Sequence, residues 1–300
     1  MAVSKQSREA PTPGADVAGR ERVAVRRILR VDDGGGRADD DALTAEEPLE
    51  IRIGELPIAV VMRTPCDDFE LAAGFLLTEQ IVSGPADLAA ISYCPTAEPP
   101  NLENVVDVRL AAGVEFDREA VQRNFYASSS CGICGKASIA AVLRGAEPLP
   151  VRFQVDRSIL GGLSGRMRQA QQVFERTGSL HAAALFDPAG ELLVLREDVG
   201  RHNAVDKVVG SYVVRNATLP PACVLMVSGR ASFEVMQKAH AAGIPFVAAV
   251  SAPSSLAVDL ACDAGMTLVG FLRDRSFNVY AGAERISGVT QPQQVHSREG

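Results

Sequence analysis

The pattern of apolar and polar positions divides the chain into two parts. In the first part, apolar and polar residues alternate along short runs, as they do in strands that are buried on one face. Val106, Val108 and Leu110 form one such run. The residues from Leu49 to Thr64 form two more runs around Gly54-Glu55, which predicts a hairpin.

One helix is predicted directly after this hairpin. In TPCDDFELAAGFLLTEQI, the apolar residues from Phe69 to Leu77 recur at helical spacing. Thr64 is a suitable N-cap, and Pro65 suits the first helical position. Earlier in the chain, Val23 to Val31 is a predicted strand, and the acidic, glycine-rich residues from Asp32 to Glu47 are a predicted loop. The first part is therefore mixed α+β.

The second part alternates nearly continuous apolar runs with helical patterns. The runs ACVLMVSG, IPFVAAVS and MTLVGFL are typical of strands that are covered on both faces. Two further strands flank a turn at residues 187–190, and helices are predicted over 158–177, ended by Gly178, and over 202–213. This order predicts a three-layer α/β domain with parallel crossovers.

These patterns give an α/β fold class and a set of predicted boundaries. Residues 1–20 are a predicted disordered tail, and 291–300 are a second tail. The smaller α+β domain covers 21–127 and the larger α/β domain covers 146–290, with a loop and a short helix between them at 128–145.

Composition restricts the classes of function. The formal net charge of −7 disfavours general binding to nucleic acid, which usually requires a basic surface. No window holds enough uninterrupted apolar residues for a membrane span, and the N-terminus lacks the apolar core of a secretory signal. We therefore expect a cytoplasmic protein whose thiols stay reduced.

Two of the six cysteines are paired by spacing, in SSSCGICGKASI. A zinc site requires a second pair or spaced histidines, and a thioredoxin-like pair follows a strand, whereas Cys131 follows a polar loop. The chain also lacks the His-x-Glu of zinc deaminases. A displayed nucleophile fits better, because serines, glycines and Lys136 favour access and thiolate formation. The alternative is a pair of buried structural cysteines; no metal site is predicted.

The remaining cysteines are expected to be structural. Cys223 and Cys262 lie in apolar runs and should be small buried hydrophobes, and Cys94 precedes a proline. The charged residues from Glu197 to Lys207 allow two interpretations, a functional site or a salt-bridged end of a secondary-structure element.

Two turns follow apolar strands and open helices, so they are expected at the carboxyl edge of the sheet, where N–H groups can bind phosphate. The first contains Ser228, Gly229 and Arg230, and the second contains Ser251, Ser254 and Ser255. After the last apolar strand, Arg273 and Arg275 could pair with phosphates or occupy an exposed turn.

Together, five segments resemble the FdhD family, the sulfur carriers required for formate dehydrogenase. They are RTPCDDFELAAGFLLTEQI, SSSCGICGKASI, EDVGRHNAVDKVVG, VSGRASFEVMQKAHAAGIPFVAAVSAPSSLAVDLA and GMTLVGFLRDRSFNVY, and the resemblance runs from about Glu47 to Ile286. One residue departs from the family pattern, because Cys66 stands where the family has glycine.

The resemblance implies a chemistry and a set of partners. A cysteine desulfurase would supply sulfur as a persulfide on Cys131, with Cys134 as a helper or resolving thiol. The sulfur would pass to the molybdenum bis(molybdopterin guanine dinucleotide) cofactor, held as a bound substrate, before its insertion into formate dehydrogenase. The family also implies a homodimer and a C-terminal domain similar to the cytidine deaminase fold.

The resemblance assigns cofactor binding to one stretch after the last apolar strand, namely Phe271, Leu272, Arg273, Asp274, Arg275 and Ser276. Two other functions are alternatives for the same features. One is a nucleotide-binding regulatory protein whose cysteine pair senses redox state, and the other is a thiol–disulfide oxidoreductase.

Overall fold

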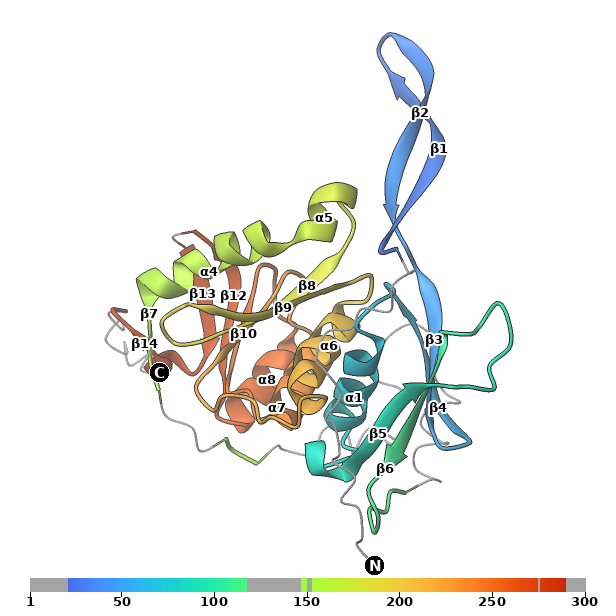
Figure 1. Ribbon diagram of the computed structural model, residues 1–300. Helices are drawn as coiled ribbons and strands as arrows, with labels where there is room; N and C mark the ends of the chain where they lie inside the picture. Colours follow the sequence, from blue (N-terminus) through green and yellow to red (C-terminus); the bar gives the residue numbers. More distant parts are fainter. Residues whose placement is uncertain (1–20, 118–146, 150–152, 275, 290–300) are drawn as a thin grey trace, which may run out of the picture.

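The computed structural model describes residues 21–117, 147–149, 153–274 and 276–289. In these ranges a six-stranded sheet and a four-stranded sheet lie on opposite sides of a layer of helices (Figure 1). Helix α1 (Asp68–Thr78) covers the smaller sheet, and helix α6 (Arg201–Val213) covers the larger one. The two helices pack against each other, so the two sheets are joined through helices.

The larger sheet has the strand order β13-β12-β11-β10-β8-β9. Its strands are β8 (His181–Phe186), β9 (Leu192–Asp198), β10 (Val224–Val227), β11 (Phe246–Ala249), β12 (Thr267–Arg273) and β13 (Ser276–Ala281). The central strands β10, β11 and β12 are parallel, as predicted, whereas β8, β9 and β13 are antiparallel to their neighbours.

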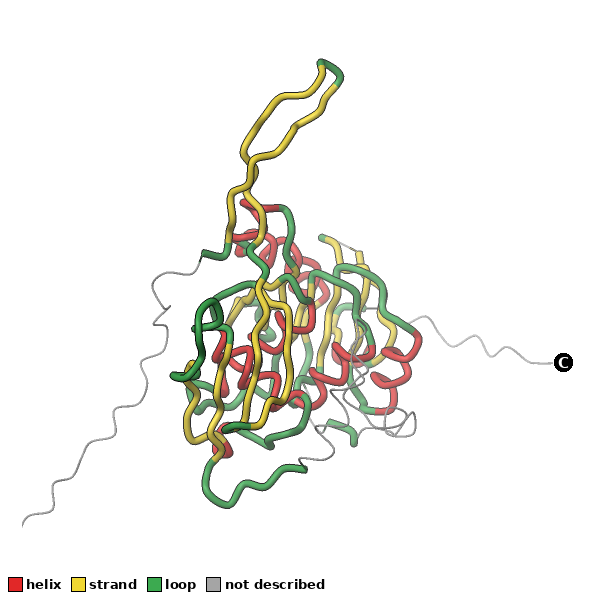
Figure 2. Tube along the Cα trace, turned by 90° about the vertical axis from the view of Figure 1, so that its right-hand side faces the viewer, coloured by secondary structure: helices red, strands yellow, loops and turns green. Residues whose placement is uncertain are grey.

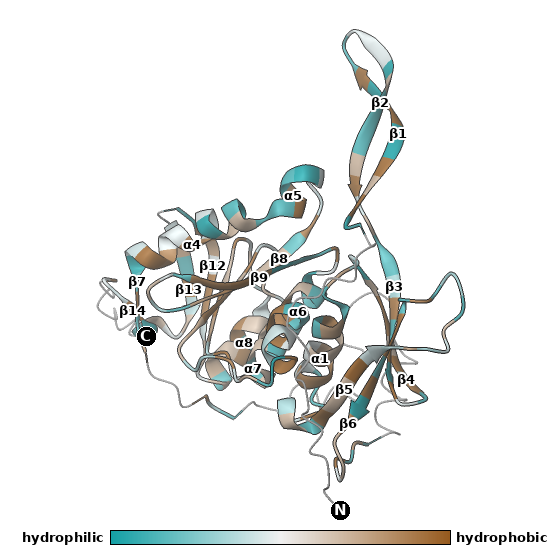
Figure 3. Cartoon of the chain, in the orientation of Figure 1, coloured by the Kyte–Doolittle hydropathy of each residue, from teal (hydrophilic) through white to brown (hydrophobic). Residues whose placement is uncertain are grey.

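Helices cover both faces of this sheet. Helix α6 lies on one face with α7 (Phe233–Ala241) and α8 (Ser255–Asp263), and α4 (Arg157–Ala170) lies on the other. The strands between them are mainly hydrophobic (Figure 3), because both of their faces are buried. The predicted three-layer α/β arrangement is therefore confirmed, while the likeness to the cytidine deaminase fold and the domain boundaries stay predictions.

The smaller sheet has the order β4-β3-β6-β5. Strands β3 (Glu47–Ile53) and β4 (Leu56–Arg63) form the predicted hairpin, β5 (Leu88–Tyr93) and β6 (Val105–Leu110) complete the sheet, and β3 and β6 are parallel. The short strands β7 (Val155–Asp156) and β14 (Ile286–Ser287) pair separately.

The acidic segment after Asp32 is a strand, so the predicted loop is wrong. Strand β2 (Gly35–Thr44) pairs with β1 (Val23–Asp32) in an antiparallel arm that projects from the body of the protein (Figure 2). Arg30 lies 2.8 Å from Asp39 across the two strands. The aspartates that suggested a loop therefore pair with arginines on the neighbouring strand.

Helix α1 begins at Asp68, later than predicted. Asp67 is the N-cap, and both Asp67 and Cys66 adopt positive φ angles, 57° and 79°. Thr64 does not cap the helix: its hydroxyl accepts from the backbone N–H of Val199 at 3.1 Å, its own N–H donates to Asp198 at 3.1 Å and its carbonyl accepts from Lys207 at 2.8 Å. Cys66 thus has a positive φ angle, which glycine adopts without strain, and this is consistent with the glycine expected there from the family resemblance.

The single helix predicted over 158–177 is interrupted. Helix α4 ends at Ala170, and a short helix α5 (Gln172–Thr177) begins after Gln171. The buried carboxylate of Glu197 accepts hydrogen bonds from the backbone N–H groups of Val173 and Phe174, at 2.9 and 2.8 Å. These bonds to Glu197 hold the start of α5 at the edge of the sheet. Helix α5 ends at Gly178, as predicted.

Helices α1 and α6 touch through two glycines. A Cβ atom added to Gly74 would lie 1.8 Å from the carbonyl oxygen of Asp206, and one added to Gly210 would lie 1.7 Å from that of Glu70. Both distances are to backbone atoms, which cannot rotate away. Glycine is therefore required at both positions for the helices to approach this closely.

A buried ion pair lies beside this contact. The Lys238 ammonium on α7 lies 3.0 Å from both carboxylate oxygens of Asp206 on α6, and it also reaches Thr78 and Glu79 at the end of α1. Burial raises the pKa of the Asp206 carboxyl, and the Lys238 charge opposes that shift. The pair links three helices where α1 meets the larger domain.

Among the described residues, no helix combines the length and the apolar character needed to span a membrane.

Gly210→Ala is expected to lower the free energy of unfolding by about 3 kcal/mol or more, because the added methyl group must push the α1 backbone away. Urea unfolding followed by circular dichroism measures this change. Gly162→Ala is the matched control, since a Cβ at this helical glycine meets nothing within 4 Å. The control should be neutral or stabilising, and equal effects of the two substitutions would contradict the packing account.

Lys238→Met is expected to lower the free energy of unfolding by about 3–5 kcal/mol, because it leaves the Asp206 carboxylate buried without its cation. Adding Asp206→Asn to this variant removes the buried charge and should recover a large part of the loss. Denaturant titrations of the two single variants and the double variant give the coupling energy. Strictly additive effects would show that the two groups do not stabilise each other.

Candidate functional site

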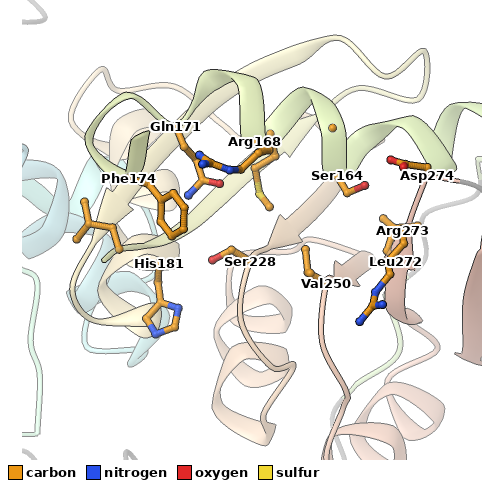
Figure 4. A pocket seen from close by; sticks show the side chains of 13 residues that line it. Ser164, Arg168, Gln171, Phe174, His181, Ser228, Val250, Leu272, Arg273 and Asp274 are labelled. Carbon is orange, nitrogen blue, oxygen red and sulfur yellow. The ribbon is translucent and has the colours of Figure 1, made fainter. Parts of the chain in front are cut away.

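A cavity of about 640 Å³ lies over the carboxyl edge of the parallel strands, beneath α4 and α5 (Figure 4). The carboxyl ends of β10, β11 and β12 meet there, and the antiparallel strand β8 begins at the same edge. This is the edge at which open α/β sheets bind ligands. The lining residues are Ser164, Gly165, Met167, Arg168, Gln171, Phe174, Leu180, His181, Ser228, Val250, Leu272, Arg273 and Asp274.

Four of the predicted cofactor residues line this cavity. Ser228 follows β10, and its side-chain oxygen accepts a 2.9 Å hydrogen bond from the backbone N–H of Ala182 on β8. Leu272, Arg273 and Asp274 lie at the end of β12 and in the turn to β13. Residues from two separate strand ends, more than forty positions apart in the sequence, therefore meet at one site.

The two predicted phosphate-binding turns lie side by side. The backbone N–H of Ser254 donates to the carbonyl of Ala231 at 3.1 Å, and the N–H of Phe271 donates to the carbonyl of Ser251 at 3.1 Å. These bonds join both turns to the end of β12. The prediction that the turns lie near the stretch after β12 is borne out by these contacts.

The remaining predicted residues do not line the cavity. Gly229 lies next to His181, because a Cβ atom added to this glycine would be 3.4 Å from the His181 ring. Arg230 is exposed. Ser254 caps α8 by accepting from the N–H of Ala257, and Ser255 is the first residue of that helix. Phe271 is 41% exposed, and Ser276 pairs with Arg273 across the β12–β13 turn. Cofactor binding by these residues stays a prediction.

Three predicted site residues lie outside the described residues. They are Cys131 and Cys134, in the segment 118–146, and Arg275.

Sequence reasoning missed the part of the cavity that α4 and α5 provide. The guanidinium of Arg168 lies 4.2 Å from the centre of the Phe174 ring, a cation–π contact on the cavity wall. Gln171, at the break between the helices, is 4% exposed. The sequence predicted only one continuous helix over 158–177, because periodicity does not reveal that a helix ends over a cavity.

His181 contributes an uncharged ring to this wall at neutral pH. Burial lowers the pKa of its imidazole, and the neighbouring positive charge of Arg201 lowers it further. His202 itself lies 3.0 Å from the carboxylate of Glu234.

Most of the charged segment from Glu197 to Lys207 is structural. The carboxylate of Asp198 accepts hydrogen bonds from the backbone N–H groups of Thr64 and Gly200 and from the Asn203 side chain, and it pairs with Lys207 at 2.8 Å. Both Asp198 and Lys207 are buried. The interpretation as a salt-bridged end of an element is therefore the correct one for these residues.

The unpaired cysteines differ in environment. Cys223 is fully buried, as predicted, and burial raises the pKa of its thiol to about 12. Cys262 is exposed on the outer side of α8, so its predicted burial is wrong. The helix turns this position to solvent, in line with Ser255 and Asp259. Cys94 is partly buried, and its contact with Thr96 lowers the pKa of its thiol.

Comparisons with known proteins agree with this architecture. The FdhD/NarQ family model matches residues 44–287. The sulfur carrier protein FdhD of Streptomyces coelicolor is 56% identical over 270 residues, which cover 87% of this chain and 95% of that protein. The sulfur carrier protein FdhD of Mycobacterium tuberculosis is 51% identical over 258 residues, which cover 82% and 92% of the two chains.

One solved structure has the same fold. It is a candidate formate dehydrogenase accessory protein from Desulfotalea psychrophila, with a TM-score of 0.71 and 24% sequence identity. The match covers 89% of this chain and all of that one. The extent of the family match and the identity to its members lead to one conclusion: this chain belongs to the FdhD/NarQ family.

Proposed function

We propose that this protein is a sulfur carrier that accepts sulfur on Cys131 and passes it to a molybdenum cofactor with guanine dinucleotide arms. Membership of the family supports the sulfur chemistry. The observation that supports the cofactor is the cavity itself, where Ser228 and Arg273 meet at the carboxyl edge of the sheet. In the proposed reaction, sulfur carried on Cys131 passes to a cofactor bound in this cavity.

The sulfur transfer would take place by exchange between thiolates and sulfur–sulfur bonds. The Cys131 thiolate attacks the outer sulfur of a persulfide on a cysteine desulfurase, which forms a new S–S bond on Cys131 and releases the desulfurase thiolate. The Cys134 thiolate then attacks the inner sulfur, Sγ of Cys131. This forms a Cys131–Cys134 disulfide and releases the carried sulfur as hydrosulfide to the cofactor. A cellular thiol would reduce the disulfide afterwards.

The cavity suits a ligand with phosphates. Arg273 supplies a planar guanidinium that can bind two phosphate oxygens at once, which a lysine cannot do. Ser228 supplies a hydroxyl after the carboxyl end of β10, at the same edge of the sheet. A volume of about 640 Å³ is also in the range of small-molecule sites.

The proposal includes partners and a compartment. A cysteine desulfurase would donate the sulfur, and a formate dehydrogenase would receive the completed cofactor. The protein would act as a homodimer in the cytoplasm, where thiols stay reduced.

Cys131→Ala is expected to abolish the persulfide that forms when the protein is incubated with a cysteine desulfurase and cysteine. Intact-protein mass spectrometry detects the persulfide as the added mass of one sulfur atom. Cys262→Ala is the matched control, because it removes an exposed thiol that is not part of the cysteine pair and should leave the persulfide unchanged. Persulfide formation in Cys131→Ala at the level of the wild type would rule out this residue as the carrier.

Arg273→Ala is expected to weaken GDP binding by roughly tenfold to a hundredfold, because a charge-assisted contact to phosphate contributes about 1.5–3 kcal/mol. Calorimetric titration of GDP, which stands in for one cofactor arm, measures the change. Arg176→Ala on α5 removes an exposed arginine that does not line the cavity and should leave the affinity unchanged. Unaltered GDP binding in Arg273→Ala would place the phosphate site elsewhere.

A further inference from the structure

The arm formed by β1 and β2 exposes an apolar face along its length. Side chains alternate between the two faces of a strand, and cross-strand partners in an antiparallel ladder share a face. Val25, Leu29 and Val31 lie on one face of β1, and they are 62%, 68% and 70% exposed. An isolated two-stranded hairpin is only marginally stable, and clustered apolar side chains on a surface mark sites of association. The arm is therefore suited to a partner that covers this face.

The same face is buried where the arm joins the body of the protein. Val23 is 4% exposed and packs with Val173 of α5 and with Leu180. Thr44, the cross-strand partner of Val23, donates its hydroxyl to the carbonyl of Ser179 at 2.7 Å. Beyond this root the arm projects away from the body (Figures 1 and 2). The exposed residues thus continue a face that is already packed at its root.

The two strands differ in size and in charge on this face. Each large apolar residue of β1 lies beside a small residue of β2, in the pairs Val25–Ala42, Leu29–Ala38 and Val31–Gly36. Between the first two pairs, Arg27 of β1 lies 3.2 Å from Asp40 of β2, and the two side chains are 68% and 61% exposed. The β1 side of the face is therefore large and basic, and the β2 side is small and acidic.

A second copy of the arm matches this pattern when a two-fold axis runs along the arm, between the two apolar faces. This axis places β1 of each copy over β2 of the other, with both arms pointing the same way. Large side chains then lie over small residues, as close packing requires. Arg27 lies over Asp40 of the partner subunit. A two-fold axis across the arm would instead place Arg27 over the same arginine of the partner, which is unfavourable.

We propose that the β1–β2 arm is a self-complementary interface, on which two copies of this chain associate with β1 of one copy over β2 of the other. A two-fold interface uses the same surface on both copies, and this face is complementary to itself in size and in charge. The inference rests on the homodimer of the proposed function and assigns a contact surface to it. It places the bodies of both copies at the same end of the paired arms.

Reversal of the two charges tests this arrangement. Arg27→Asp is expected to raise the dissociation constant of the dimer by about a hundredfold or more, because it places like charges opposite each other twice in the interface. Asp40→Arg should have the same effect. An equimolar mixture of the two variants should form heterodimers, since the reversed charges then face each other. Sedimentation velocity under reducing conditions measures the dissociation constants, and native mass spectrometry distinguishes heterodimers by mass.

A double variant and a control define the geometry. The double variant with Arg27→Asp and Asp40→Arg should dimerise with itself but not with the wild type, because the mixed pair places like charges over each other. Arg26→Asp is the matched control, since its side chain lies on the opposite face of β1, and it should leave the dissociation constant unchanged. The far-ultraviolet circular dichroism of all variants should equal that of the wild type, because the substituted side chains are exposed.

Three results would overturn the inference. A wild-type protein that stays monomeric up to about 100 µM would refute both the arm interface and the homodimer. An Arg27→Asp dimer as tight as that of the wild type would leave the homodimer standing and place its interface elsewhere. Heterodimers of the double variant with the wild type would show that β1 lies over β1. The persulfide on Cys131 is measured separately, so a failure of the proposed sulfur chemistry is distinguishable from all three.

Discussion

The close approach of two helix backbones at Gly74 and Gly210 is the constraint on which the rest of this structure depends. It brings α1 into direct contact with α6, so the smaller sheet and the larger sheet share one helical layer. The ion pair between Asp206 and Lys238 lies at the same junction. A buried ion pair fixes the relative orientation of the elements it joins more clearly than it adds net stability. This pair connects α7 to α6 and α1, the helices that pack on the two sheets.

Two consecutive carboxylates on β9, Glu197 and Asp198, connect the segment before α1 with the elements around the cavity. Successive side chains on a strand point to opposite faces, and Glu197 and Asp198 at the end of β9 do so. Asp198 holds the Thr64 segment that leads into α1, whereas Glu197 holds the first turn of α5 over the cavity. The position of the cavity roof and the docking of the smaller domain therefore depend on neighbouring residues of one strand.

The elements that the sequence predicts well are those in which local pattern and tertiary packing agree. The buried strands β10, β11 and β12 and the turns that follow them are examples, because continuous apolar runs require two covered faces. The errors arise where a distant residue decides local structure. The backbone of β1 pairs with residues 35–44, which are a strand where a loop was predicted, and Glu197 holds the start of α5 after the break at Gln171. Nothing within residues 158–177 reveals that a carboxylate from β9 caps the second helix, so the α4–α5 wall of the site could not be foreseen.

The central claim is that a molybdenum cofactor with guanine dinucleotide arms occupies the cavity between the strand ends and the α4–α5 wall. Native mass spectrometry of the protein purified from cells that make this cofactor tests the claim most directly, because it weighs the protein and its cargo together. We predict a bound mass equal to that of the cofactor with both arms, displaced by excess GDP. A protein that carries sulfur but no cofactor, or a bound cofactor that excess GDP does not displace, would contradict the account.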